Sequence, residues 1–101
     1  MSQYSNFKDF YPFYLGEHAN LTCRRLHFAG TTGVVIIAAL VAAQVLLLAW
    51  LWAIPVCGYG FAWAGHFFFE KNRPATFKYP FYSLLGDWVM YKDMLTGKIK
   101  I

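Results

Sequence analysis

The sequence lacks charge over a long central stretch. Residues 26–69 contain no Asp, Glu, Lys or Arg, and only 14% of the 101 residues are charged. A single helix of this length would measure roughly 66 Å, about twice the roughly 30 Å hydrocarbon core of a bilayer. The stretch therefore predicts two apolar helices joined by a turn, a helical hairpin whose two ends lie on the same side.

The chain is also poor in the residue types that several enzyme classes require. The spacing of its two cysteines, Cys23 and Cys57, does not form a CxxC motif and predicts free thiols. Neither a GxSxG nucleophile motif nor a glycine-rich phosphate loop is present. Three histidines are too few for the eight-histidine site of membrane di-iron hydroxylases. Metal chemistry would have to use His18, His27 and His66.

Apolar residues are abundant instead. Hydrophobic residues make up 58% and aromatic residues 21% of the sequence, more than a soluble domain of this size can bury. The composition predicts an all-α membrane protein with a transmembrane helical hairpin, a short interfacial N-terminal helix and a C-terminal amphipathic helix. We expect a single membrane domain over residues 1–101, with spans at about 30–44 and 46–69.

The basic residues predict the orientation and the partners. Lys and Arg flank the apolar stretch on both sides and are absent from its turn. The positive-inside rule then places both termini in the cytoplasm, at the inner membrane if the protein is bacterial. Nucleic acid is not expected as a partner, since no basic helix or aromatic platform stands free of the membrane. Small residues at Gly58, Ala62 and Gly65 let another helix approach closely, so an oligomer is compatible with the sequence.

Helix boundaries follow from proline, asparagine and glycine. Pro12 predicts the start of a short helix that ends at about His18. Asn20 is expected to cap the helix that enters the membrane. The turn is expected near Gln44, and Pro55 predicts a kink in the return helix.

A last helix is expected after the hairpin. Pro80 predicts its start, about Leu95 its end, and Gly97 its C-terminal cap. Its apolar stripe is expected at four positions: Leu84, Trp88, Tyr91 and Leu95.

The histidines allow two interpretations. Imidazole is the commonest side-chain metal ligand, and polar groups at membrane depth tend to be functional. A break near Asn20 would let His18 and His27 converge, and the hairpin would bring His66 to the same side. The alternative is three separate hydrogen-bonding residues at the membrane interface.

Two carboxylates are candidates for a supporting role. Glu70 lies four residues after His66, on the same face of an α-helix, and is a candidate further ligand. Asp87 lies next to the apolar stripe and is a candidate to hold a metal-bound imidazole through its second nitrogen. Each is equally compatible with an ordinary surface carboxylate.

Three segments carry the motifs of a known family. Residues 13–20 read FYLGEHAN, residues 25–31 read RLHFAGT, and residues 59–75 read YGFAWAGHFFFEKNRPA. Together they resemble a family of small membrane proteins, formerly a domain of unknown function, that includes the fungal endoplasmic-reticulum 2-hydroxy fatty acid (2-hydroxypalmitate) dioxygenase. The resemblance extends over roughly residues 7–98.

The resemblance implies an Fe(II)-dependent dioxygenase that shortens 2-hydroxy fatty acids by one carbon (fatty acid alpha-oxidation), with O2 and without 2-oxoglutarate. The larger eukaryotic members carry a further histidine between the motifs, which this chain lacks. Glu70, Asp87 or water would take that place. The positions that match the family are the histidines His18, His27 and His66 and the other motif residues Asn20, Lys71 and Asn72.

A 2-hydroxy fatty acid would chelate the metal through its hydroxyl and carboxylate oxygens and leave room for O2. Arg24, Arg25 and Arg73 are candidates to hold the carboxylate, because the guanidinium fork suits it. Each arginine is equally a candidate positive-inside anchor. The acyl tail would extend between the aromatic-rich helices.

Two other functions fit the same sequence. One is a non-enzymatic lipid-binding or structural membrane protein. The other is a zinc-dependent membrane hydrolase with a water ligand. Metal content and dependence on O2 distinguish all three.

Overall fold

The computed structural model describes residues 4–100, and this part of the chain is helical without strands. The all-α prediction is therefore confirmed. The four α-helices are α1 (Phe7–Gly16), α2 (Leu21–Ala42), α3 (Ala53–Ala64) and α4 (Pro80–Leu95). Three shorter segments complete the fold: the 3-10 helices η1 (Leu48–Trp52) and η3 (Ala75–Phe77) and the π-helix η2 (Gly65–Glu70).

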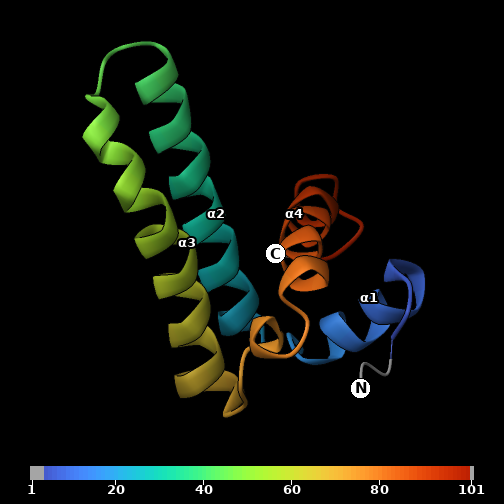
Figure 1. The fold of residues 1–101 in the computed structure, drawn as a ribbon. Coiled ribbons are helices and arrows are strands. Elements are labelled where there is room, and N and C mark those ends of the chain that lie inside the picture. Colours follow the sequence, from blue (N-terminus) through green and yellow to red (C-terminus); the bar gives the residue numbers. More distant parts are fainter. Residues whose placement is uncertain (1–3, 101) are drawn as a thin grey trace.

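Helices α2 and α3 lie side by side and run in opposite directions (Figure 1). The chain reverses after α2, where Gln44 adopts a φ of 63°. The two helices approach closely at Gly30, where a Cβ would lie 2.9 Å from the Cβ of Phe61 and 3.0 Å from the carbonyl oxygen of Cys57. Only glycine allows this packing, because any side chain would meet backbone atoms.

The segments Leu21–Ala42 and Leu48–Glu70 are long and apolar enough to cross a membrane. The first begins nine residues before the predicted residue 30 because the cap at Asn20 is confirmed: its Oδ1 accepts a hydrogen bond of 3.1 Å from the Cys23 N–H. The outer surface is apolar and exposed, as at Trp52, which is 81% accessible. Both cysteines are free thiols, as predicted.

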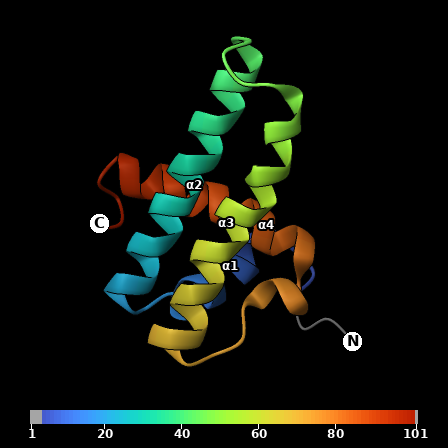
Figure 2. The same cartoon turned by 90° about the vertical axis from the view of Figure 1, so that its left-hand side faces the viewer.

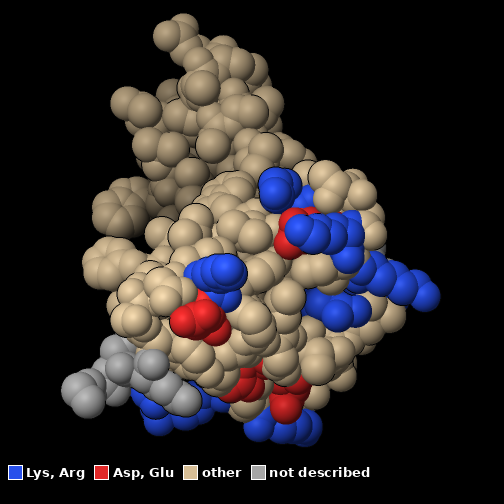
Figure 3. Space-filling view, turned by 90° about the vertical axis from the view of Figure 1, so that its right-hand side faces the viewer, with Lys and Arg blue, Asp and Glu red and all other residues tan. Residues whose placement is uncertain are grey.

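Helices α1 and α4 pack on each other beside the lower half of the hairpin (Figures 1 and 2). The Tyr11 hydroxyl donates a hydrogen bond of 2.8 Å to Asp93 and ties the two helices together. The buried hydrophobic core lies between α1, α4 and the η3 segment that precedes α4. It consists of Phe10, Tyr14, Ala75, Tyr79, Met90 and Met94. In Figure 3 the charged residues gather over this layer, and the projecting hairpin shows none on the face in view.

The prediction made from Pro12 needs correction. Helix α1 begins at Phe7 and not at Pro12, because the Asn6 side chain caps it by accepting a hydrogen bond of 2.8 Å from the Asp9 N–H. Pro12 lies inside the helix on an exposed side. Pro55 lies in the first turn of α3, close to the change from η1 to α3, and the kink expected there stays a prediction.

The bounds predicted for α4 are confirmed, and Gly97 follows the helix with a φ of 81°. The predicted stripe is not the packed face, however: Leu84, Trp88 and Leu95 are 50%, 43% and 60% exposed. The packed face is the neighbouring one, because Gly86 lets the Tyr14 ring lie directly against α4. Its buried residues are Ser83, Gly86, Met90, Asp93 and Met94.

Candidate metal centre

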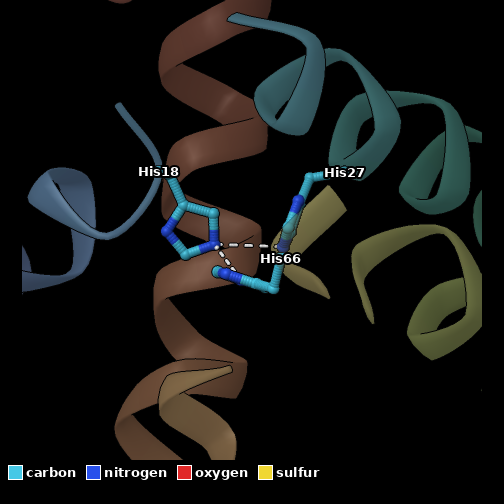
Figure 4. A group of neighbouring side chains, drawn as sticks. All are labelled: His18, His27 and His66. Carbon is cyan, nitrogen blue, oxygen red and sulfur yellow. Dashed lines mark hydrogen bonds between the residues drawn. The ribbon is translucent and has the colours of Figure 1, made fainter. Parts of the chain in front are cut away.

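Three histidines from three different segments converge at the base of the hairpin. His18 lies in the turn between α1 and α2, His27 on the second turn of α2, and His66 on η2 (Figure 4). The Nε2 atom of His18 lies 3.0 Å from the Nε2 of His27 and 3.0 Å from the Nε2 of His66. All three side chains are buried, with at most 6% of their surface exposed.

The opposite nitrogen of each ring is held by a protein oxygen. The Nδ1 atoms of His18, His27 and His66 bond at 2.7, 2.9 and 2.7 Å to the Tyr14 carbonyl, the Cys23 carbonyl and the Asn72 Oδ1 respectively. Because these oxygens only accept, each Nδ1 carries the proton and each Nε2 keeps a lone pair. Lone pairs that face each other at 3.0 Å repel unless an electron-pair acceptor lies between them. The three histidines could therefore hold one cation between them.

Two of the three separations between the Nε2 atoms, those from His18, fit a first-row metal ion. Metal–nitrogen bonds to histidine are about 2.0–2.1 Å long, so three nitrogens at right angles around an ion lie about 3.0 Å apart. The two separations from His18 match this value. The potential ligand atoms of the three histidines all lie within 4.8 Å of one another. Such a set leaves the other side of the ion open, and imidazole suits iron as well as zinc.

The His18 ring stays neutral far below neutral pH. Burial lowers its pKa from 6.5 to about 2, and the nearby His27 adds to this effect. A neutral imidazole is the form that can bind a metal, and burial keeps His18 in that form in mildly acidic solution.

The end of α1 explains the position of His18. Carbonyls in the last turn of a helix have free lone pairs, and the Tyr14 carbonyl takes the Nδ1–H of His18. The Tyr14 ring also stacks on the imidazole, with ring centroids 4.1 Å apart and an interplanar angle of 27°. Tyr14 itself is 1% exposed. One buried residue thus fixes both the direction and the plane of the His18 ring.

The π-helix η2 and the turn after it explain the position of His66. Lys71 adopts a left-handed φ of 60°, and the N–H groups of Lys71 and Asn72 both donate to the His66 carbonyl. This turn brings the Asn72 side chain back to the His66 ring. Asn72 Nδ2 in addition donates to the carboxylate of Glu17 at 2.8 Å, beside His18. One asparagine therefore couples the first and last histidines of the site. Single π-helical turns are frequent at functional sites.

The carboxylate Glu70 is engaged elsewhere. Its Oε1 accepts a hydrogen bond from the backbone N–H of Asn20 and so ties η2 to the start of α2. Among residues 4–100, the cluster able to hold a metal consists of the three histidines without a carboxylate.

Asp87 accepts a hydrogen bond from the Tyr14 hydroxyl. It therefore acts on the His18 ring through Tyr14, and the partner of each imidazole Nδ1 is a different oxygen. Burial raises the pKa of Asp87 from 3.8 to about 6, an effect that the Tyr14 hydrogen bond opposes.

Two cavities adjoin the histidines. The smaller, about 20 Å³, borders all three of them. The larger, about 210 Å³, lies between α2, α3 and α4 and has mostly apolar walls. Four residues line both cavities: His27, Tyr59, Ala62 and Asp87.

The predicted arginines lie outside both cavities. Arg25 and Arg73 are exposed, and the Arg73 guanidinium lies over the Phe77 ring at 5.8 Å. Arg24 is partly buried, and it also is absent from the cavity walls.

The sequence did not point to the residues that hold the rings of His18 and His27. Tyr14 and Cys23 each lie four residues before the histidine that they orient, a spacing at which a helical carbonyl is within reach of a side chain. This spacing was a usable signal. Glu17 and Asn72 are 55 residues apart, and their contact has no local signal.

Comparisons with known proteins identify the family. No curated protein and no solved structure matches the chain. A protein-family model described as 2-hydroxy-palmitic acid dioxygenase Mpo1-like matches residues 4–99, nearly the whole chain. The resemblance carried by the histidine motifs is thereby confirmed. The chain belongs to the 2-hydroxy-palmitic acid dioxygenase Mpo1-like family.

Proposed function

We propose that the protein is a membrane-bound Fe(II)-dependent dioxygenase that shortens 2-hydroxy fatty acids by one carbon. One observation carries the proposal: three buried imidazoles bring their Nε2 atoms together, with those of His27 and His66 each 3.0 Å from that of His18, and each Nδ1 lies within hydrogen-bond distance of a protein oxygen. The family description names the type of reaction and the substrate class. We choose iron over zinc because zinc has no redox chemistry.

The reaction balances without a further reductant. A 2-hydroxy acid R–CH(OH)–COOH and O2 give R–COOH, CO2 and H2O. The bond between C1 and C2 breaks, C2 rises from the alcohol to the carboxyl level, and C1 leaves as CO2. The substrate gives up four electrons, which is the number that O2 accepts. Neither 2-oxoglutarate nor a reduced nucleotide is therefore required.

The residues of this chain have separable tasks in the proposal. His18, His27 and His66 would hold the metal. When bound, ferrous iron supplies electrons and a template for oxygen ligands. Asn72 and the backbone carbonyls of Tyr14 and Cys23 hold the rings in one tautomer and one orientation. Glu70 and Asp87 support the site through Asn20 and Tyr14.

We place the hairpin across the membrane and the α1–α4 layer on its cytoplasmic surface. Two apolar segments of sufficient length support this placement, together with the charged residues that gather over α1 and α4 (Figure 3). The acyl tail would enter the cavity of about 210 Å³ between α2, α3 and α4. The exposed apolar side of α4 would face lipid. A reporter fused at Gln44 should lie on the opposite side of the membrane from reporters at either terminus.

Anaerobic reconstitution tests the function. Purified protein in detergent is loaded with ferrous iron, then given O2 and 2-hydroxypalmitate. We expect about one iron per chain and pentadecanoic acid as the product, detected by mass spectrometry. His27→Ala should lose both iron and product, whereas Trp52→Phe, on the exposed outer surface, should keep both. Iron-loaded protein that yields no shortened acid would contradict the proposal.

The same experiment separates the alternatives. A zinc-dependent hydrolase would purify with zinc and would act on its substrate without O2. A non-enzymatic lipid-binding or structural protein would fold and bind lipid without metal, and His27→Ala would leave lipid binding unchanged.

A further inference from the structure

Three buried side-chain polar atoms lack hydrogen-bond partners in the part of the chain that the structure describes, and two of them belong to residues in the wall of one cavity beside the histidines. The third, Nε of Arg24, belongs to a residue that lines neither cavity. Ser83 Oγ and Trp63 Nε1 are both cut off from solvent, and neither has a partner within the part of the chain that the structure describes. Ser83 is only 3% exposed as a whole. Both residues line the cavity of about 20 Å³ that borders the three histidines. Buried polar groups are almost always paired, so two unpaired ones in the wall of one cavity call for a ligand.

The chemistry of the pair defines that ligand. An indole N–H can only donate, and a serine hydroxyl is free to donate. Two donors beside a cation site suit an anionic oxygen, because hydrogen bonds to a charged acceptor are the stronger kind. A cavity of about 20 Å³ admits a group the size of a water molecule or a carboxylate oxygen. It has no room for an acyl chain.

We propose that the Ser83 hydroxyl and the Trp63 indole N–H bind the carboxylate of the 2-hydroxy fatty acid. The inference rests on the proposed function for the identity of the substrate. It assigns the carboxylate to a neutral donor pair and not to an arginine, because no arginine lines either cavity.

The neighbouring cavity fits the rest of the molecule. It is lined by apolar residues of α2, α3 and α4, among them Val34, Ile54 and Leu84. It shares part of its wall with the small cavity, as at Tyr59 and Ala62. A carboxylate held in the small cavity therefore places the alkyl chain at the entrance of the large one.

A ligand-binding role predicts an unusual stability for the Ser83→Ala variant. An unpaired buried hydroxyl destabilises the free protein, so removing it should leave the melting temperature unchanged or raise it. A hydroxyl that served the fold would lower the melting temperature on removal. Loss of ligand affinity without loss of stability distinguishes the two roles.

The experiment compares two ligands that differ in charge. Binding of 2-hydroxypalmitate and of hexadecane-1,2-diol, which keeps the chain and the 2-hydroxyl but lacks the carboxylate, is measured by calorimetry on iron-loaded protein under argon. Ser83→Ala and Trp63→Phe should each weaken acid binding about tenfold or more and change diol binding by less than about twofold. Ser83→Thr keeps the hydroxyl and should retain acid binding. Ser5→Ala and Trp52→Phe, both at exposed positions, are the matched controls.

Several results would overturn the inference. One is equal loss of acid and diol binding in Ser83→Ala, which indicates packing. Another is unchanged acid binding in both variants, which indicates that water satisfies the two donors. A wild-type protein without preference for the acid would overturn it as well.

The results distinguish a failure of the dioxygenase proposal from a failure of the carboxylate site. If the acid binds in a Ser83-dependent way and no shortened product forms, the dioxygenase proposal is wrong and the carboxylate site stands. If product forms and Ser83→Ala leaves the acid preference unchanged, the dioxygenase proposal stands and the carboxylate site is wrong.

Discussion

At the tip of the hairpin, Val45, Leu47 and Leu48 are 69%, 78% and 74% exposed, whereas at its base His18 and His66 are 1% and 2% exposed. The tip presents apolar side chains to its surroundings, and the base holds polar rings away from them. The tip and the base of the hairpin therefore place different requirements on their residues. The tip requires only apolar character, which many residues supply, and the base requires particular atoms at particular distances.

The difference lies in how each end is constrained. If the hairpin lies in a membrane as proposed, any apolar side chain of suitable size is accepted there, and the tip should tolerate substitution. At the base, each imidazole is fixed by a hydrogen bond to a chosen oxygen, and two of those oxygens belong to the backbone. The following predictions test how sharply these two ends differ, and the first three run from the largest expected effect to the smallest.

Removal of one ligand should have the largest effect. His66→Ala takes one of three nitrogens from the site, and we expect iron binding to weaken by more than about 100-fold. Leu47→Ala at the tip should leave iron binding unchanged. Iron per chain after dialysis against a weak chelator measures both. Equal iron content in the two variants would contradict the prediction that iron binding depends on the base of the hairpin and not on its tip.

Removal of a supporting contact should have a smaller effect of the same kind. Asn72→Leu leaves the Nδ1–H of His66 without its acceptor and should lower metal affinity by about 10- to 100-fold. Asn6→Ala is the matched control, since Asn6 caps α1 away from the site. That change should cost about 1 kcal/mol of stability and leave metal affinity as it is. Competition with a coloured chelator gives the affinities.

Packing along the hairpin gives a third comparison. Gly30→Ala places a Cβ within 3.0 Å of Phe61 and Cys57 and should destabilise the protein by about 1–3 kcal/mol. Gly60 has open space where a Cβ would lie, so Gly60→Ala should be neutral or stabilising by up to about 1 kcal/mol. Thermal melting in detergent measures both. Similar melting temperatures would show that the helices do not pack as described.

The last prediction concerns the pH dependence of stability. The pKa of Asp87 is raised from 3.8 to about 6, so between these values the unfolded chain ionises while the folded protein keeps the proton. Stability contributed by the protonated form is therefore present below about pH 4 and is lost as the pH rises through about 6. The stability of Asp87→Asn relative to the native protein should rise by about 3 kcal/mol over this window, because each pKa unit corresponds to about 1.4 kcal/mol. A difference independent of pH would contradict the raised pKa.

Much of the fold could be predicted because local rules decide it. The charge-free residues 26–69 indicated two apolar helices, and Asn20 and Pro80 marked the correct helix starts. The start of α1 was missed because Pro12 outweighed the Asn6 cap, although both signals were in the sequence. The packed face of α4 was also missed, since the small residue Gly86 and not the apolar stripe decides where α1 lies.

The site was only partly predictable. The three histidines could be named from their scarcity and from the motifs, but their convergence depends on where α1 lies beside the hairpin. The donors at Ser83 and Trp63 have no signature in the sequence, because the lack of a partner appears only when the surrounding atoms are placed.

The π-helical segment that carries His66 has a consequence for the length of the chain. In an α-helix each residue turns the side-chain direction by about 100°. If Gly65 were deleted, His66 would move to the preceding position of the segment, and its side chain would turn by about 100° away from the direction of His18 and His27. No substitution nearby could restore the angle. The number of residues in this turn is therefore as strict a requirement for assembling the three imidazoles as the identity of the histidine itself.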